Sequence, residues 1–164
     1  MKYKLVAFWL IVFGALFAFL QMCFEYHFYY IEQSQLFLFS EAYIRNKLLL
    51  PGGFSMLVAE FLVQFFIRPY VGALVTAVLL TGVGVCTAGI VKRIAPVSGL
   101  FILYVLPMLA LLFMHFDFNY RVQGTVCYLM MMALLCGYMR IRNDLFRLVA
   151  GCVLVPVSYT HLTL

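Results

Sequence analysis

Charged side chains are scarce in this chain. Asp, Glu, Lys and Arg together make up 10% of its 164 residues, whereas a soluble domain carries about 25%. Only six of these residues are carboxylates. So little charge cannot solvate the surface of a globular protein of this length, and the composition therefore excludes an ordinary soluble domain.

Recognisable catalytic and metal-binding motifs are also lacking. The chain contains no glycine-rich phosphate-binding loop and no zinc-binding box. Its cysteines lie singly inside apolar segments without any C-x-x-C pair, which suggests neither a disulfide framework nor a metal site. We expect them to pack as small apolar side chains, and no cofactor is implied. The cysteines are Cys23, Cys86, Cys127, Cys136 and Cys152.

Hydrophobic residues, in contrast, make up 66% of the chain, and aromatic residues 18%. A soluble fold cannot bury this much apolar surface, so lipid must be the solvent for most of the chain. The formal net charge is +5. Because the basic residues flank apolar segments, they indicate orientation in a membrane rather than a nucleic-acid partner. The sequence predicts an all-α, polytopic transmembrane helical protein whose main partner is the lipid bilayer.

Apolar runs of membrane-spanning length recur along the chain. The first follows two lysines and is longer than the ~7–15-residue apolar region of a signal peptide, so we expect an uncleaved helix. The expected transmembrane helices are 5–24, 70–91, 97–116 and 123–139, with a truncated fifth beginning at 148. Within 70–91, small residues recur at every fourth position, which permits close approach of another helix.

The end of the chain suggests that it is a fragment. Residues 157–164 read VSYTHLTL, which resembles a non-native tail translated from linker sequence in fragmentary sequencing data. We therefore expect residues 1–156 to be the N-terminal transmembrane region of a longer protein. The further helices of the missing C-terminal part are expected partners of this region.

Residues 33–67 form the longest stretch without an expected transmembrane helix. Apolar and polar positions within 33–50 approximate helical spacing, which predicts an amphipathic helix lying in the membrane interface. Pro51-Gly52-Gly53 ends that helix. The following apolar run, 54–67, has 14 residues and spans about 21 Å as a helix, short of the ~30 Å hydrocarbon core. We expect an outer re-entrant or interfacial helical hairpin.

The distribution of basic residues gives an orientation. If 54–67 does not cross, seven basic residues fall on one side of the membrane and four on the other. The positive-inside rule then places the N-terminus in the cytoplasm and the hairpin outside. A crossing by 54–67 would reverse every later side and remove this bias.

Glu25 and Glu32 are the candidate catalytic residues. They follow the first expected helix, with His27 between them. A carboxylate there can act as a general base, and a pair can hold a divalent cation. The simpler alternative is that Glu25 lies at the membrane interface and Glu32 is solvated.

Glu60 is the candidate binding residue with the least ordinary surroundings, because it interrupts the apolar run 54–67. An ionisable group among Leu, Val and Phe can bind a proton, an amine or a basic partner. Gln64 lies one helical turn later and shares its face. The structural alternative is exposure at the interface, or pairing of Glu60 with Arg68 or Arg45.

Asp117 and Arg121 belong to a short polar connection, DFNYR, on the same expected side as the hairpin. Together with Gln64 and Arg68 they are candidate substrate-binding residues that can complete a polar pocket with Glu25 or Glu32. A plain helical hairpin is the favoured alternative for this connection. His115 is expected to lie at the interface rather than to take part in catalysis.

Several local patterns carry a family resemblance. They include the aromatic stretch Phe28–Gln35, the Pro51-Gly52-Gly53 break, the segments 60–62 and 64–66, and Pro69 before Gly72-Ala73. Through these the chain resembles a family of uncharacterised multi-pass bacterial inner-membrane proteins of Bacteroides-type bacteria, classed as a domain of unknown function. The resemblance covers most of the chain and implies a longer parent protein in the bacterial inner (plasma) membrane.

A weaker likeness is to multi-spanning glycosyltransferases that use lipid-linked sugar donors. These enzymes also have a first helix followed by a long outer loop with acidic residues near its start, although their aspartate-led motif is missing here. Three hypotheses follow: an inner-membrane component of the cell envelope without an assigned activity, a transferase acting on a lipid-linked substrate at the outer leaflet, and a transporter fragment with Glu60 as coupling residue.

Overall fold

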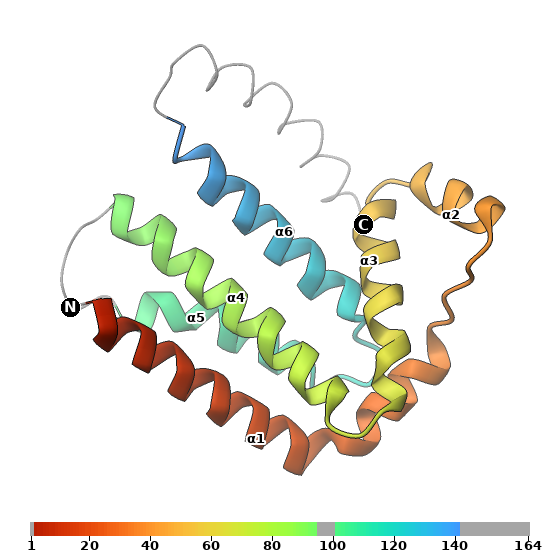
Figure 1. The fold of residues 1–164 in the computed structure, drawn as a ribbon, viewed down its shortest axis with the longest axis horizontal. Coiled ribbons are helices and arrows are strands. Elements are labelled where there is room, and N and C mark those ends of the chain that lie inside the picture. The colour runs from red at the N-terminus through yellow and green to blue at the C-terminus, as the bar shows by residue number, and fades with distance from the viewer. Residues whose placement is uncertain (1, 95–100, 142–164) are drawn as a thin grey trace.

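The computed structural model describes residues 2–94 and 101–141. Helices and turns make up this part of the chain and no strand occurs in it, which confirms the expected all-α fold. Figure 1 shows the elements, which are α1 (Lys2–Ser34), α2 (Glu41–Leu48), α3 (Gly53–Val63), the 3-10 helix η1 (Gln64–Ile67), α4 (Val71–Ile94), α5 (Phe101–Met114) and α6 (Val122–Tyr138).

Helix α4 lies at the centre of the bundle and packs against α1, α5 and α6. Near its start, Gly72 lies against Phe28, in the second half of α1. Further along α4, Gly84 lies against Trp9, near the start of α1. The two helices are therefore antiparallel, and they meet where glycine allows an aromatic ring to approach the backbone.

The other two neighbours of α4 differ in direction. Lys92 lies over the ring of Tyr104 in α5, with 5.7 Å between its Nζ and the ring centroid. Because Tyr104 is near the start of α5 and Lys92 near the end of α4, these helices are antiparallel. Helix α6 runs parallel to α4, since Gly82 faces Leu129 and Gly89 faces Cys136. The four long helices thus alternate in direction, as Figure 1 shows.

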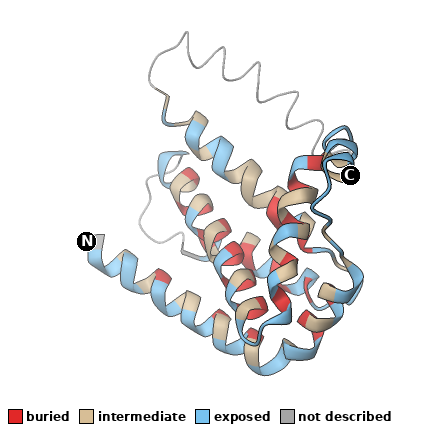
Figure 2. Ribbon diagram, turned by 45° about the vertical axis from the view of Figure 1, so that its right-hand side comes forward, coloured by how far each residue is buried: buried red, intermediate tan, exposed pale blue. Residues whose placement is uncertain are grey.

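The bundle interior combines small and large apolar residues, and many large apolar residues also face outward. The inner face of α4 buries Ala73, Ala77 and Ala88, and Figure 2 shows the buried positions on the facing sides of the helices. Large exposed side chains on the outer faces of α1, α4 and α5 include Leu10, Ile11, Leu74, Val85, Leu106 and Phe113.

The expected end of the first helix at residue 24 coincides with a kink in α1. Phe24 has a non-helical φ of −126° and ψ of 15°, and a second helical segment, which the sequence did not predict, continues beyond it to Ser34. Phe28 and Ile31, beyond the kink, are buried in the same core as α4 and η1. Packing against these elements stabilises the helical segment after the kink.

Residues 33–67 contain three helices in place of the expected two. The long amphipathic helix over 33–50 is reduced to α2, and Ser40 caps it by accepting a hydrogen bond from the Tyr43 amide at 3.2 Å. Gly52 begins the next turn in the left-handed region with φ 70°. A side chain at Gly53 would lie 1.9 Å from the Lys47 carbonyl oxygen, so only glycine fits there. Helix α3 and η1 together match the expected segment 54–67.

Two helices, Tyr3–Ser34 and Val71–Ile94, are long and apolar enough to cross a membrane. Ile102–Met114, Val122–Tyr138 and Gly53–Ile67 are apolar but shorter. The two spans expected at 97–116 and 123–139 therefore correspond to helices that, over the described residues, fall short of the ~20 residues needed to cross. The fifth segment from 148 and the tail 157–164 lie outside the described residues.

Candidate functional site

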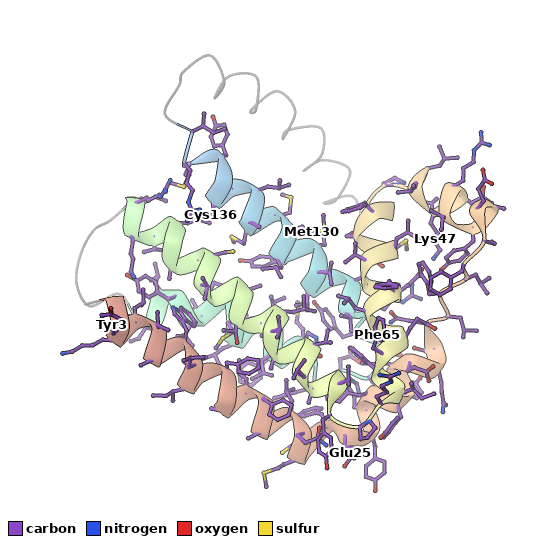
Figure 3. All side chains as sticks on the ribbon, in the orientation of Figure 1. Tyr3, Glu25, Lys47, Phe65, Met130 and Cys136 are labelled. Atoms are coloured by element: carbon purple, nitrogen blue, oxygen red, sulfur yellow. The ribbon has the colours of Figure 1, made fainter. Side chains whose placement is uncertain are left out.

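A small hollow lies where α1 meets the turn between η1 and α4. Its empty space of about 180 Å³ includes open solvent, and its enclosed part, about 10 Å³, has room for about one water molecule. Its polar lining comes from Gln21, Glu25 and Tyr29 of α1 and from Arg68 and Tyr70 of the turn. Figure 3 labels Glu25 at this end of the bundle, away from Tyr3 at the start of the same helix. Of the predicted site residues, the hollow brings together Glu25 and Arg68.

The turn Arg68–Tyr70 holds its side of the hollow in a strained conformation. Tyr70 has a φ of 69°, the left-handed region that costs an L-residue about 1 kcal/mol or more. Its carbonyl oxygen accepts a hydrogen bond from the Leu74 amide at 3.0 Å, and the Arg68 carbonyl oxygen accepts one from the Val71 amide at 3.2 Å. These bonds start α4 directly after Pro69 and keep Arg68 beside α1.

Both charged groups of the hollow are exposed. Among the described residues the ion pair within 4.0 Å is the one between Lys47 and Glu60, so Glu25 and Arg68 do not neutralise each other. The hollow therefore presents one free carboxylate and one free guanidinium. A ligand with an anionic group for Arg68 and a cationic or hydroxyl group for Glu25 matches this arrangement.

Glu32 does not line the hollow. It lies seven residues after Glu25 in the same helix, which separates the two backbones by about 10 Å along the helix axis. Oxygen ligands of one Ca²⁺ ion lie ~2.3–2.6 Å from the metal. The two carboxylates are thus too widely spaced along α1 to form a compact pair, and a joint catalytic role for them stays a prediction.

Glu60 lies in a separate polar cluster between α2 and α3. Lys47 Nζ is 2.7 Å from Glu60 Oε1, the Tyr43 hydroxyl donates to Glu60 Oε2, and Lys47 also lies 5.4 Å from the centroid of the Tyr43 ring. The expected partners Arg68 and Arg45 were wrong, because the turn after α2 brings Lys47 over α3 instead. Burial and the Glu60 carboxylate raise the pKa of Tyr43 to about 12.

Gln64 is held by the backbone rather than by Glu60. Its Nε2 donates to the carbonyl oxygen of Gln35 at 3.1 Å, which ties η1 to the segment after α1. Glu60 and Gln64, which were predicted to share a helix face, thus each bind a different segment: Glu60 binds α2, and Gln64 binds the segment after α1. Neither lines the hollow.

Asp117 and Arg121 occupy the connection between α5 and α6. Asp117 Oδ1 accepts a hydrogen bond from the Asn119 amide at 2.9 Å, and its carbonyl oxygen accepts one from the Tyr120 amide at 3.1 Å. Arg121 is the residue before the first turn of α6. The connection is therefore a plain helical hairpin, the alternative that the sequence favoured. Neither Asp117 nor Arg121 lines the hollow.

Two histidines near this connection are buried in the protein. His115 is 2% exposed, and its Nδ1 lies 2.8 Å from the Leu111 carbonyl oxygen; its expected place at the membrane interface stays a prediction. His27 is 6% exposed among aromatic rings. The sequence did not single out Lys47, Tyr43 and Tyr70, because their roles depend on which helices meet.

Comparison with known proteins gives one match. No curated protein and no solved structure matches the chain. The model of one family, described as "Family of unknown function (DUF6057)", matches residues 1–163. The matched range includes most of 157–164, where a non-native tail stays a prediction. Because the match extends over nearly the whole sequence, the chain belongs to the DUF6057 family of unknown function.

Proposed function

We propose that the chain is a multi-pass membrane protein of the bacterial inner membrane that binds the headgroup of a lipid or lipid-linked envelope molecule. The observation that carries the membrane part is the abundance of large apolar side chains on the outer faces of α1, α4 and α5. Alanine and glycine lie at several close contacts of α4, and many leucine, isoleucine, valine and phenylalanine side chains are exposed on the outside of the bundle. Close helix contacts at small residues, together with large apolar residues exposed on the outside, suit a helical bundle whose solvent is lipid.

The alternating helix directions support four passages through the bilayer. In this arrangement the membrane-crossing part of α1 is 5–24, before the kink, and α3 and η1 do not cross. Lys4, Lys92, Arg93 and Arg140 then share one end of the bundle, and Glu25 and Asp117 share the other. The positive-inside rule assigns the basic end to the cytoplasm, with the N-terminus there.

The hollow at the acidic end supports the binding part of the proposal. Its Arg68 offers the planar, bidentate donor that suits a phosphate, and Tyr29 and Tyr70 supply rings with one polar and one apolar end, which favour the headgroup layer. A lipid-linked molecule bound there keeps its chain against the outer faces of the helices. Its phosphate meets Arg68, and the rest of its headgroup lies next to Glu25.

A transferase remains the second candidate, since Glu25 can act as a general base on a hydroxyl group held in the same hollow. The transporter hypothesis receives less support. Glu60 already has two polar partners, Lys47 and Tyr43, so its carboxylate acts first as a link between α2 and α3.

Binding of a lipid phosphate can be measured by native mass spectrometry of the purified protein with polyprenyl phosphate and with phosphatidylglycerol. We expect Arg68→Gln to weaken binding of a phosphate-bearing lipid by about tenfold, the loss of one charge-assisted contact. Arg45→Gln is the matched control, because Arg45 is an exposed arginine on α2 outside the hollow. Equal binding by the two variants would exclude the hollow as the binding site.

A further inference from the structure

His27 is a buried histidine that has no hydrogen-bond partner among the described residues. Both of its ring nitrogens are inaccessible and unbonded. A neutral imidazole has one donor and one acceptor, and leaving such a group unpaired in a protein interior costs ~1–3 kcal/mol. Unpaired buried groups are rare in folded proteins, so this one calls for an explanation.

Aromatic rings form the walls around His27. The centroid of the Phe118 ring is 5.0 Å from that of the His27 ring, and the centroids of Phe24 and Phe28 are 5.9 and 6.4 Å away. Phe24 and Phe28 come from α1, whereas Phe118 belongs to the α5–α6 connection and is 64% exposed. An exposed side chain on a turn is thus the outer cover of a buried titratable group.

Two titratable groups from outside α1 act on His27. The carboxylate of Asp117, one residue before Phe118, attracts the protonated ring, and His115 at the end of α5 is close enough to interact with it. His115 already has partners: Nδ1 lies 2.8 Å from the Leu111 carbonyl oxygen, and Nε2 lies 3.5 Å from Thr125 Oγ1. On α1 itself, Glu25 lies on the nearly opposite helix face, at about 100° per residue, and lines the hollow together with Arg68.

Protonation changes the hydrogen-bonding requirement of the His27 ring. The imidazolium has two donors and a positive charge, and the phenyl rings around it cannot accept hydrogen bonds of ordinary strength. Asp117 Oδ1 accepts from the Asn119 amide, and the second carboxylate oxygen has no hydrogen bond among those of the described residues. A carboxylate oxygen is therefore available for a charged N–H from His27 if the turn shifts.

We propose that His27 is a proton-binding site, and that its protonation pairs it with Asp117 and displaces the Phe118 side chain that covers it. A solvent proton adds to the unprotonated ring nitrogen, and the resulting imidazolium donates to the carboxylate. Burial lowers the pKa of His27 below its ordinary value of 6.5, and the attraction of Asp117 offsets part of this effect. The closed arrangement binds a proton less readily than a solvated histidine does, so it loses stability as the pH falls below about 6.5.

Thiol accessibility in the turn measures this opening. In a cysteine-free protein in detergent, single cysteines at Asn119 and at Ser40 are labelled with a maleimide between pH 7.5 and 5.0. Both positions are exposed, and the ratio of the two rates removes the effect of thiol ionisation. We expect acidification to raise the Asn119-to-Ser40 ratio by about threefold to tenfold, since protonation shifts the equilibrium by up to about tenfold per pH unit.

Three substitutions separate the role of His27 from a general effect of acid. His27→Gln should abolish the rise, whereas His115→Gln should keep it. Asp117→Asn preserves the turn, since asparagine also accepts from the amide two residues on, but it should move the midpoint to lower pH. This shift tests the proposal even if His27→Gln fails to fold.

A pH-independent ratio in the parent protein, or an unchanged rise in His27→Gln, would overturn the proposal. Retention of the same midpoint in Asp117→Asn would exclude the pairing with the carboxylate. The assay uses neither a lipid substrate nor a bilayer, so its outcome does not depend on the proposed binding function.

Discussion

At the scale of single residues, the ionisable group in the most apolar surroundings is a structural link. Glu60 stands in a run of Leu, Val and Phe, and its side chain is 14% exposed. Lys47 and the Tyr43 hydroxyl occupy both of its oxygens. The carboxylate thus has one charged and one polar partner in a partly buried place where an isolated charge would be costly.

Removing the charge of Glu60 should therefore destabilise the hairpin. We expect Glu60→Gln to lower the free energy of unfolding by about 1–3 kcal/mol, because it leaves the Lys47 ammonium without its counter-ion in a partly buried site. Thermal unfolding in detergent measures the change. Glu41→Gln is the matched control, since Glu41 is an exposed carboxylate in the first turn of α2, where its interaction with the helix dipole is worth ~0.3–1 kcal/mol.

Replacing both partners provides a second check on this interpretation. The double variant Glu60→Gln with Lys47→Met removes the unpaired charge, and it should be more stable than Glu60→Gln alone. If the double variant loses as much free energy of unfolding as Glu60→Gln and Lys47→Met lose together, the ion pair contributes nothing to the contact between α2 and α3.

At the scale of helices, glycine determines how closely α1 approaches α4. A Cβ at Gly84 would lie 2.6 Å from two atoms of the Trp9 ring, and one at Gly72 would lie 2.6 Å from Cγ of Phe28. Both contacts are far inside van der Waals distance, and the obstructing atoms belong to buried rings that have little room to move. The close packing of α1 on α4 thus depends on two glycines that face aromatic side chains.

Gly84→Ala should lower the free energy of unfolding by about 1–3 kcal/mol, the usual cost of overpacking. Gly14→Ala in α1 is the matched control, because nothing lies within 4 Å of the added Cβ, and it should be neutral or stabilising by up to ~1 kcal/mol. Urea or thermal unfolding in detergent compares the two variants. In a Trp9→Phe background the smaller ring leaves space, so the cost of Gly84→Ala should fall; an undiminished cost would place the strain elsewhere.

At the scale of the whole molecule, the alternating helices give a specific two-sided topology. Tyr3 and Ile94 are exposed at one end of the bundle, and Ser40 and Asn119 are exposed in the elements at the other. None of these residues is charged, so their replacement leaves the charge bias of the chain unchanged. A cysteine at Ser55, in α3, would not be accessible to a labelling reagent, because this position is fully buried.

Single cysteines at these four positions, in a cysteine-free background, should sort into two pairs. In intact cells an impermeant maleimide should label Ser40→Cys and Asn119→Cys, and it should reach Tyr3→Cys and Ile94→Cys only after permeabilisation. Labelling of Ile94→Cys from outside, with Tyr3→Cys protected, would show that the segment 54–67 crosses the membrane. Equal labelling of all four without permeabilisation would exclude the four-pass arrangement.

The amino-acid sequence by itself determined the secondary-structure class and the approximate helices of the bundle. Long apolar runs, proline and glycine breaks and the scarcity of charge are local properties, and local properties suffice to predict where a helix starts or stops. The helices expected at 54–67, 70–91 and 123–139 agree with the structure within a few residues at each end. The same reasoning placed the end of the first helix at the kink at Phe24 but missed the helical segment that continues to Ser34, whose Phe28 and Ile31 pack in the common core.

The tertiary structure alone decided which polar residues meet. Glu60 lies nearer in sequence to Arg68 than to Lys47, yet the tight turn at Gly52-Gly53 folds α2 back onto α3 and selects Lys47. Glu25 and Arg68 line the same hollow because α1 and α4 are antiparallel, and His27 lies under Phe118 because α5 ends beside the end of α1. Such contacts depend on helix direction and on the rotation of each helix about its axis, and packing against other helices sets both.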